Sequence, residues 1–249
     1  MLLHLHHSLP TAVRPSPNVL RIAAMFGLGL DDQPHLQLIP PITLNLTPKQ
    51  LIFITGPSGS GKSTILRLIT NALTSPSHAH PRESDHETDH TRIRLIRFDD
   101  LPPLPDAPLV DCFNLPLEDT LSLLARAGLA DAFVMLRRPA ELSDGQRYRL
   151  RLAQTMAIAH QHPEADLIVI LADEFGAVLD RITASVIARN VRRWTTQMPN
   201  LCFIAATTHD DLLEPLDPDV LIEKQPGSEV AVVEKEVQNA KGSERRVQD

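Results

Sequence analysis

The sequence is poor in cysteine, with only Cys112 and Cys202 among 249 residues. Cys202 lies in the apolar run LCFIAATTH, and we interpret it as a small core residue. Two cysteines cannot form a disulfide framework, so a fold held together by several disulfides is excluded. The composition is typical of a reducing compartment, and we expect a cytoplasmic protein.

Long hydrophobic runs are also missing. No stretch approaches the roughly 18 consecutive apolar residues that a membrane-spanning helix needs. The first 17 residues, MLLHLHHSLPTAVRPSP, interrupt their apolar run with histidines and have no basic lead, which argues against a secretory signal peptide. We expect a soluble chain that would serve a membrane only through another polypeptide.

Basic residues are fewer than acidic ones, so the net charge is −7 and the isoelectric point is near 5.9. An acidic chain argues against bulk binding of nucleic acid. The basic run Arg147, Arg149 and Arg151 is the one hint of a nucleic-acid surface. A solvated helix face explains that run better, so a DNA-transaction protein is only a weakly supported hypothesis.

Apolar strands and amphipathic helices alternate along the chain. Strands are predicted at 50–56, 92–98, 167–174, 201–209 and 219–224, and helices at 61–73 and 182–196. This alternation predicts an α/β fold, with a mostly parallel core sheet flanked by helices. Residues 19–47 leave room for a small N-terminal β region. A largely helical block at about 111–155 interrupts the alternation and predicts a helical side lobe.

The remaining segments are polar or rich in proline. We expect residues 1–18 and the tail 236–249 to be flexible, with the folded domain at 19–235. The insertion 74–91, TSPSHAHPRESDHETDHT, is interpreted as a flexible loop. The alternative is a metal site formed by its four histidines, His78, His80, His86 and His90. Their spacing matches no standard zinc pattern, so the loop interpretation is preferred.

The strongest chemical signal is GPSGSGKST at residues 56–64, here called the phosphate loop, which fits G-x-x-x-x-G-K-[ST] between a predicted strand and helix. Glycines let the backbone wrap a phosphate, and amides at a helix N-terminus bind anions. Lys62 is expected to reach the β- and γ-phosphates of ATP, and Ser63 to bind Mg²⁺. The predicted ATP-binding positions are Gly56, Pro57, Ser58, Gly59, Ser60, Gly61, Lys62, Ser63 and Thr64.

The second signal is the apolar strand LIVILADE, which ends in two carboxylates. Asp173 is expected to hold Mg²⁺, directly or through water, and Glu174 to act as the general base for the attacking water. A buried strand followed by an acidic loop is the alternative. The phosphate loop more than 100 residues upstream in an alternating fold favours the catalytic interpretation.

The stretch ELSDGQRYRLRLA, residues 141–153, begins a helix. Ser143 and Gln146 form a capping box, and Asp144 lies where the helix dipole favours negative charge. These features explain the helix start without any function. Two further candidates are Asp180 in AVLDR and His209 in ATTHDD, a histidine at a strand end that is placed to reach a γ-phosphate.

In this order, the five segments resemble the ABC-type ATPase domain, a P-loop NTPase fold, over roughly residues 20–224. They correspond to its Walker A loop (56–64), signature (142–146), Walker B strand (167–174), D-loop (177–180) and switch histidine (209). More closely, ELSDGQ, ADEF followed by LDR, and ATTHDDL resemble a soluble, non-transporter branch. In that branch the ATPase is often fused to a GNAT-type acetyltransferase domain, for which we expect no room here.

The resemblance implies a head-to-tail dimer that traps two ATP molecules. Ser143, Gly145 and Gln146 would then face the γ-phosphate bound by a second chain. Asp180 would cross the interface, and His209 would steady the γ-phosphate. An aromatic residue upstream of the phosphate loop usually stacks on adenine, and Phe26 is the candidate here.

Two departures from the family pattern stand out. Asp144 replaces a glycine, and a carboxylate near ATP costs repulsion unless it points away, caps the helix or faces a cation. The family also has a glutamine after the second core strand that senses Mg²⁺ and contacts transmembrane subunits. No glutamine occurs between Gln50 and Gln146. Asp99 or Asp100 is expected to take over the Mg²⁺ role, because a carboxylate is a hard oxygen ligand.

We therefore expect a Mg²⁺-dependent ATPase that is soluble, is not part of a transporter and acts as a homodimer or heterodimer. It would drive a conformational cycle in an unknown protein partner, an acetyltransferase being one candidate by analogy. A membrane subunit is not expected. The alternative is the ATP-binding subunit of an ABC membrane transporter, which the general motif set supports.

Overall fold

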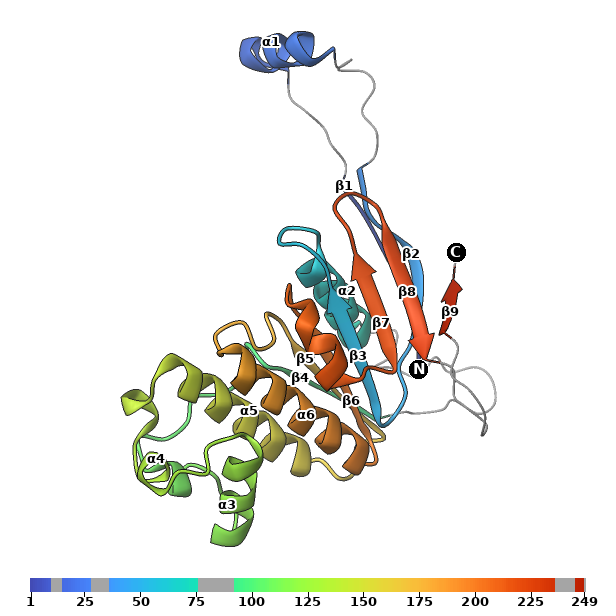
Figure 1. The fold of residues 1–249 in the computed structure, drawn as a ribbon. Helices are drawn as coiled ribbons and strands as arrows, with labels where there is room; N and C mark the ends of the chain where they lie inside the picture. The colour runs from blue at the N-terminus through green and yellow to red at the C-terminus, as the bar shows by residue number, and fades with distance from the viewer. Residues whose placement is uncertain (10–14, 28–35, 76–91, 236–244, 249) are drawn as a thin grey trace, which may run out of the picture.

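The computed structural model of the protein describes residues 1–9, 15–27, 36–75, 92–235 and 245–248 (Figure 1). Its helices are α1 (Pro17–Phe26), α2 (Lys62–Thr74), α3 (Leu117–Arg126), α4 (Ala132–Met135), α5 (Asp144–His160), α6 (Arg181–Gln197) and α7 (Leu213–Leu216). Its strands are β1 (Leu2–Leu9), β2 (Leu36–Asn45), β3 (Gln50–Thr55), β4 (Ile93–Arg97), β5 (Leu167–Ala172), β6 (Leu201–Ala206), β7 (Val220–Lys224), β8 (Val230–Lys235) and β9 (Arg245–Gln248).

The main sheet has the strand order β4-β5-β6-β3-β7-β8-β9. Its first five strands are parallel, and β8 and β9 add antiparallel strands at one edge. The five predicted core strands are all present, and the predicted fold class is confirmed. Because the core strands are parallel, their carboxyl ends meet at one edge of the sheet, where the candidate residues gather.

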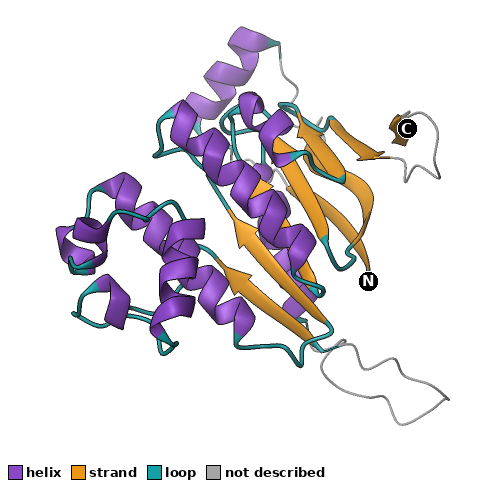
Figure 2. Cartoon of the chain, turned by 60° about the horizontal axis from the view of Figure 1, so that its bottom comes forward, coloured by secondary structure: helices purple, strands orange, loops and turns teal. Residues whose placement is uncertain are grey.

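The core strands are apolar throughout because both faces of the sheet are covered. In β3, Leu51 and Phe53 pack with residues of α5 and α6, whereas Ile52 and Ile54 pack with residues of α2 and the N-terminal strands. Figure 2 shows helices lying along the strands, with the helical lobe to one side. This packing on both faces holds the parallel strands in register, so that their carboxyl ends lie side by side.

The helical lobe consists of α3, α4 and the start of α5. It was predicted at about 111–155, and the helix that closes it continues to His160. Arg149 of α5 donates from Nη1 to the carbonyl of Gly128 (2.7 Å), which joins α5 to the end of α3. No helix in the described part of the chain has the length and apolar character needed to cross a membrane.

The expectation of a flexible segment at residues 1–18 is wrong for residues 2–9. These residues form β1, which pairs antiparallel with β2 in a separate two-stranded sheet. Leu3 and Leu5 are buried, while the intervening His4 is exposed. The alternation of leucine and histidine is therefore a strand pattern, with β2 as the partner that stabilises it.

Residues 17–26 form helix α1, where only short strands had been expected. Ser16 caps the helix by accepting a hydrogen bond from the Val19 amide (3.3 Å), Pro17 occupies the first turn, and Gly27 ends the helix with φ +63°. These are standard helix start and stop signals. Figure 1 shows α1 apart from the body of the molecule.

Two other expectations fall partly or wholly outside the described residues. The tail 236–249 was expected to be flexible, but residues 245–248 form β9, paired antiparallel with β8. Hydrogen bonds to β8 give these residues partners that their polar sequence does not reveal. The insertion 74–91 lies outside the described residues from position 76 onward, and so do its four histidines.

Candidate functional site

The phosphate loop joins the end of β3 to the start of α2. Gly56, Gly59 and Gly61 have φ values of +142°, +74° and +113°, a region that side chains disfavour. A Cβ atom at Gly56 would lie 1.9 Å from the carbonyl oxygen of Lys224, so only glycine fits there. The loop ends at the N-terminus of α2, where unpaired amides and the helix dipole attract an anion.

Lys62 is buried and folds back over the loop. Its Nζ donates to the carbonyl oxygens of Gly56 and Pro57, at 2.8 Å each. Ser63 is exposed at the next position, and within the described chain the buried Ser60 hydroxyl has no hydrogen-bond partner. The loop therefore presents a lysine and hydroxyl groups of the kinds that bind phosphate and Mg²⁺.

Three carboxylates lie close enough to the Lys62 ammonium group to affect its pKa. Burial lowers the pKa of Lys62, and the negative charges of Asp173, Asp210 and Glu174 oppose that shift, in this order. These residues come from different elements, since Asp173 and Glu174 follow β5 and Asp210 follows β6. The structure thus places the predicted lysine and the predicted pair of carboxylates in one cluster.

Glu174 has an unusual backbone conformation. Its φ of +48° lies in the left-handed region, which costs a non-glycine residue on the order of 1–3 kcal/mol. Its amide donates to Asp173 Oδ1 (3.0 Å), its carbonyl accepts from the Ala177 amide (3.0 Å), and the Phe175 amide donates to the Ala206 carbonyl (2.8 Å). These bonds hold the strained residue, which leaves its side chain exposed at the sheet edge.

Asp99 is the member of the Asp99–Asp100 pair that faces the catalytic cluster. Burial raises the pKa of Asp99, Arg151 at 3.6 Å lowers it, and Asp173 raises it again. Asp100 instead pairs with Arg97 (3.8 Å) and is mostly exposed. Asp99 is therefore the member of the pair nearer to Asp173, and its role as substitute for the family glutamine stays a prediction.

The signature segment has the predicted capping box at the start of α5. Ser143 Oγ accepts from the Gln146 amide (3.3 Å), and Gln146 Oε1 accepts from the Ser143 amide (3.0 Å). Asp144 pairs with Arg147 (2.5 Å), and Arg147 also donates to the Leu142 carbonyl (2.6 Å). Of the arrangements left open by the sequence, Asp144 therefore adopts the one in which it faces a cation.

Tyr148 connects α5 to the loop that follows Glu174, and sequence reasoning missed it. The Gly176 amide donates to its buried hydroxyl oxygen (2.9 Å). Its ring lies 4.9 Å from that of Phe98 and 6.4 Å from that of Phe175. Burial also raises the pKa of Tyr148. The only signal available was that this is the single tyrosine in the sequence.

The D-loop lies beside the signature in the same chain. A Cβ atom at Gly145 would lie 3.5 Å from Leu179 Cδ2. Asp180 caps α6 by accepting from the Thr183 amide (2.9 Å), and its hydrogen bonds with Thr183 lower its pKa. The two predicted interface segments therefore form one continuous surface.

His209 is half-buried after β6, and its amide donates to Thr207 Oγ1 (3.4 Å). The neighbouring Asp210 accepts a hydrogen bond from the Thr55 hydroxyl at the end of β3. Sequence reasoning did not select Asp210, although it directly follows His209 in ATTHDD. The bond to Thr55 brings this segment beside the start of the phosphate loop.

Phe26 is not brought to the phosphate loop. It lies at the end of α1 and is 72 % exposed. Figure 1 shows α1 separated from the end of β3, where the loop begins. The adenine-stacking role proposed for Phe26 therefore has no support in its position.

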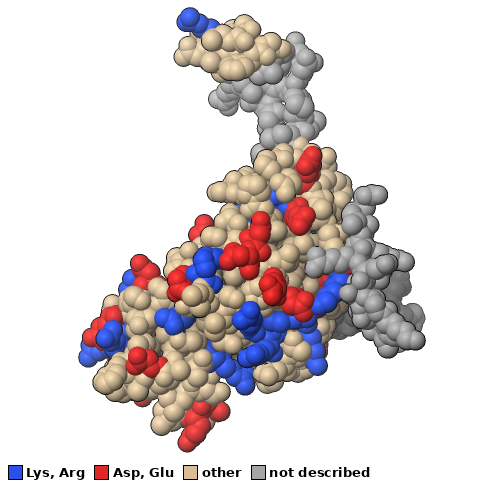
Figure 3. Space-filling view, in the orientation of Figure 1, with Lys and Arg blue, Asp and Glu red and all other residues tan. Residues whose placement is uncertain are grey.

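The arginines of α5 contact their own chain. Arg149 donates to the Gly128 carbonyl, and Arg151 donates to the Phe98 carbonyl (2.7 Å), in addition to the bonds of Arg147. Figure 3 shows that the face in view carries an acidic band near α7 beside a basic patch over α6. The bonds of the α5 arginines give that run structural partners, so the run by itself no longer indicates a nucleic-acid surface.

The residues of the cluster suit Mg²⁺ held together with a phosphate ligand. Among the described residues, no group of three or more histidine, cysteine or acidic side chains is arranged to hold a metal alone. Mg²⁺ is usually bound through one or two carboxylates plus phosphate oxygens and water. Asp173, Asp99 and Ser63 provide oxygen ligands of this type.

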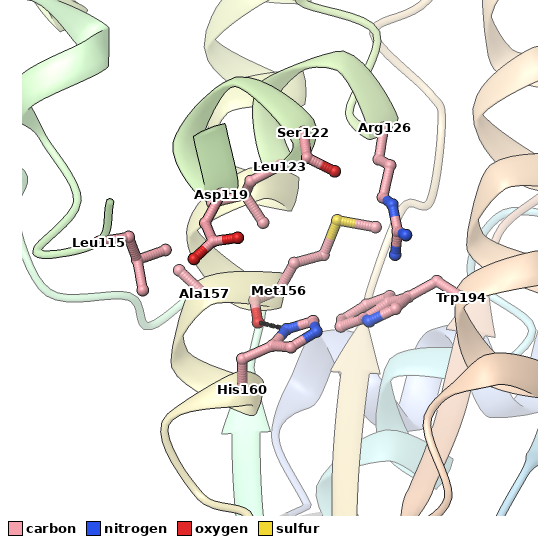
Figure 4. Close-up of a pocket in the computed structure, with 9 residues that line it drawn as sticks. All are labelled: Leu115, Asp119, Ser122, Leu123, Arg126, Met156, Ala157, His160 and Trp194. Carbon is pink, nitrogen blue, oxygen red and sulfur yellow. Dashed lines mark hydrogen bonds between the residues drawn. The ribbon is translucent and has the colours of Figure 1, made fainter. Parts of the chain in front are cut away.

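A cavity of about 310 Å³ lies between α3, α5 and α6 (Figure 4). Its lining residues are Leu115, Asp119, Ser122, Leu123, Arg126, Met156, Ala157, His160 and Trp194. His160 Nδ1 contacts the Met156 carbonyl oxygen (2.7 Å), and its ring stacks with that of Trp194 at 6.4 Å. Within the described chain the buried Trp194 Nε1 has no hydrogen-bond partner. The cavity is therefore apolar with a charged rim, and it shares no residue with the phosphate loop.

Comparison with known proteins gives consistent matches. The model of a family described as ABC transporter matches residues 39–162. The sulfate/thiosulfate import ATP-binding protein of Salmonella typhi is 31 % identical over 221 residues, covering 78 % of this chain and 54 % of that protein. The aliphatic sulfonates import ATP-binding protein of Rhodococcus jostii is 34 % identical over 173 residues, covering 68 % and 65 %. The chain thus spans about half the length of the first relative.

Solved structures show the same fold. A dimeric ATP-binding cassette in a post-hydrolysis state, bound to ADP and Pi, has a TM-score of 0.50 and 20 % identity, covering 78 % of this chain and 90 % of that one. A dimeric bacterial ABC transporter cassette has a TM-score of 0.52 and 19 % identity, covering 90 % and 94 %. At these identities the likeness concerns the fold alone.

Proposed function

The chain carries an ATPase domain of the ABC transporter family, and from this premise we propose that it is the ATP-hydrolysing subunit of a membrane importer. The cluster of Lys62 with Asp173, Glu174 and Asp210 is the observation that supports ATP chemistry. The import role is supported by the two relatives above, whose names are those of import ATP-binding proteins. They favour the transporter alternative over the soluble branch expected from the closer motif resemblance.

In the proposed reaction the phosphate loop and Lys62 bind the β- and γ-phosphates of ATP. Lys62 exchanges its bonds to the Gly56 and Pro57 carbonyls for phosphate oxygens, at little cost because both partners are acceptors. Asp173, Ser63 and Asp99 would hold Mg²⁺, which neutralises charge on the transferring phosphate.

Glu174 is the proposed general base. Its exposed carboxylate lies at the same sheet edge as Lys62, where it can accept a proton from the attacking water. The left-handed backbone at Glu174 fixes the direction of this side chain. His209, held after the neighbouring strand, contributes a contact to the γ-phosphate.

The site is completed by a second ATPase domain of the same type. Val178 and Ile182, on either side of Asp180, are 56 % and 81 % exposed, and an apolar surface of this kind favours burial against a partner. Ser143, Gly145 and Gln146 would face the ATP of that partner. The partner is a second copy of this chain or a related one.

The cavity between α3, α5 and α6 is the proposed contact for the membrane partner. Its apolar floor, which includes Leu123 and Met156, suits one or two side chains of a docked helix. Asp119 and Arg126 at its rim provide polar contacts of both signs (Figure 4). A docked helix would also lie against the Trp194 indole, which lines the cavity.

The catalytic part is tested by measuring ATP hydrolysis and dimerisation of Glu174→Gln. We expect it to bind ATP, to lose turnover and to accumulate as a dimer, whereas Lys62→Ala should lose nucleotide binding. Glu164→Gln, a change at an exposed glutamate, is the matched control and should behave like the unaltered protein. Normal turnover by Glu174→Gln would show that the base is another residue.

The transporter part is tested by co-expressing this chain with a candidate multi-span membrane subunit and measuring whether the two co-purify. Ser122→Trp fills the mouth of the cavity, and Glu118→Trp alters α3 outside the residues that line it. We expect Ser122→Trp to lose the membrane protein and Glu118→Trp to retain it, with both still binding ATP. Equal retention by both would remove the cavity from the interface.

A second candidate function is a soluble ATPase with a different protein partner. The observation that favours it is the lack of any glutamine between Gln50 and Gln146, in the region where the family glutamine that contacts transmembrane subunits is expected. A pull-down with Glu174→Gln in ATP distinguishes the two. Recovery of an acetyltransferase or another soluble protein, without any membrane protein, would favour the second candidate.

A further inference from the structure

Lys224, the last residue of β7, is completely buried. Its Nζ donates to the backbone carbonyls of Gln225 (2.5 Å), Gly227 (2.6 Å) and Glu229 (3.4 Å). Lysine is almost never fully buried unless it is paired, and in the described residues no carboxylate forms an ion pair with this ammonium group. Among the described residues, the hydrogen bonds to this positive charge therefore come from backbone carbonyls, and the Glu229 carboxylate is near enough to favour the charge without forming an ion pair.

This lysine contacts both ends of the phosphate loop. Its carbonyl oxygen lies 1.9 Å from where a Cβ of Gly56 would be, and its Cε lies 3.5 Å from where a Cβ of Gly61 would be. The side chain therefore lies against the phosphate loop between Gly56 and Gly61. The glycines at Gly56 and Gly61 are what allow this close approach.

We infer that Lys224 is a positioning residue of the nucleotide site, whose buried charge stabilises the polyphosphate bound at the adjoining loop. The inference rests on the proposed ATP site. A buried charge with no ion-paired carboxylate among the described residues is costly, and a polyanion bound at the adjoining loop supplies further negative charge close to it. The attraction acts through the protein interior, where charges are screened less than in water.

The same contacts allow a purely structural role, in which Lys224 pins the β7–β8 turn. Burial lowers the pKa of Lys224, and the Glu229 carboxylate opposes that shift, so the charge is already costly to keep before nucleotide binds. The two roles differ in one measurable way. An electrostatic role produces a loss of affinity that grows with the charge of the ligand, whereas a structural role weakens all nucleotides alike.

The experiment measures the dissociation constants of ATP, ADP and AMP by equilibrium binding in EDTA at low salt. Lys224→Met keeps the length of the side chain without its charge, and Lys224→Gln keeps a donor for the turn carbonyls. We expect both to weaken ATP binding by about tenfold, ADP binding by less and AMP binding hardly at all. Lys235→Met, an exposed lysine on β8 paired with Asp217, is the control and should change none of the three.

Thermal unfolding of the nucleotide-free proteins completes the test. Lys224→Met removes the cost of burying a charge but leaves the turn carbonyls without a donor, whereas Lys224→Gln keeps a donor, so at least one of the two variants should unfold no earlier than the unaltered protein. Unchanged ATP affinity, an equal loss for all three nucleotides, or failure of both neutral variants to fold would each overturn the inference. Lack of ATP binding by the unaltered protein would instead refute the proposed function.

Discussion

Replacing Tyr148 by phenylalanine tests how the signature helix is joined to the catalytic loop. The change removes the hydroxyl oxygen that accepts a hydrogen bond from the Gly176 amide (2.9 Å). It leaves the ring in place between Phe98 and Phe175. Gly176 is buried, so its N–H loses its partner without gaining water, which costs about 1–3 kcal/mol.

The stability loss is measured by urea unfolding and by thermal unfolding. A loss near 2 kcal/mol corresponds to a Tm lower by about 4–8 °C in a chain of this size. Thr195→Val is the matched control, because it removes a buried hydroxyl on α6 that donates to the Val191 carbonyl, away from the site. The Val191 carbonyl lies inside helix α6, where the backbone also supplies a hydrogen-bond donor. The control should therefore lose less stability than Tyr148→Phe.

The same variant should affect catalysis, because Gly176 lies two residues after Glu174. With its amide released, the loop can shift and displace the base, and we expect kcat to fall by about tenfold. The KM for ATP should stay within about twofold, since none of the contacts of Tyr148 involves the phosphate loop. Unchanged stability together with unchanged kcat would refute the reasoning and show that Gly176 finds another partner.

Three further outcomes are expected. Gly56→Ala should abolish ATP binding, measured by equilibrium binding, because the new Cβ would lie 1.9 Å from the Lys224 carbonyl oxygen at a φ of +142°. The Cys202 thiol should resist iodoacetamide at pH 8, followed by mass spectrometry, because burial raises its pKa to about 12. The Arg181 guanidinium lowers the pKa of Asp211 below its usual value, so this pair stabilises the fold above about pH 4 and loses that effect as pH falls through the lower folded value. The difference in unfolding free energy between the unaltered protein and Asp211→Asn should therefore be constant at neutral pH and shrink in acid.

The core fold was predictable because its signals are local. The strand before the phosphate loop and the helix after it are set by the motif itself, so Gly56 and Lys62 fall where the sequence placed them. The start of α5 was equally predictable, since Ser143 and Gln146 are three residues apart. The roles assigned to these residues remain predictions for the experiments above.

The parts that could not be predicted depend on partners distant in sequence. Tyr148 meets Gly176 across 28 residues, and Arg151 meets Phe98 across 53. No local pattern distinguishes a tyrosine that accepts such a bond from one that simply packs. The buried position of Lys224 follows in the same way from the meeting of β7 with the phosphate loop, and its sequence, VLIEK, suggests only a strand end.

The predictions for the N-terminal region were wrong for a different reason. In β1, leucines alternate with histidines, and this pattern was not taken as a strand. Leu3 and Leu5 are buried in the folded protein, where β2 pairs with β1. Phe26 was selected as an aromatic residue upstream of the phosphate loop, but the Ser16 cap and Pro17 begin a helix that takes it elsewhere. Local helix signals thus outweighed the family expectation.

The length of α5 has a mechanical consequence. This helix runs without a break for 17 residues, about 25 Å at 1.5 Å per residue. Ser143 is its N-cap and Gly145 lies in its first turn, and its last residue, His160, lines the cavity between α3, α5 and α6. A rotation of about 10° about the first turn would displace the far end by about 4 Å, given that length. If the signature closes onto a nucleotide as proposed, the same rotation would change the shape of the cavity, and a partner docked there would oppose or assist that closure.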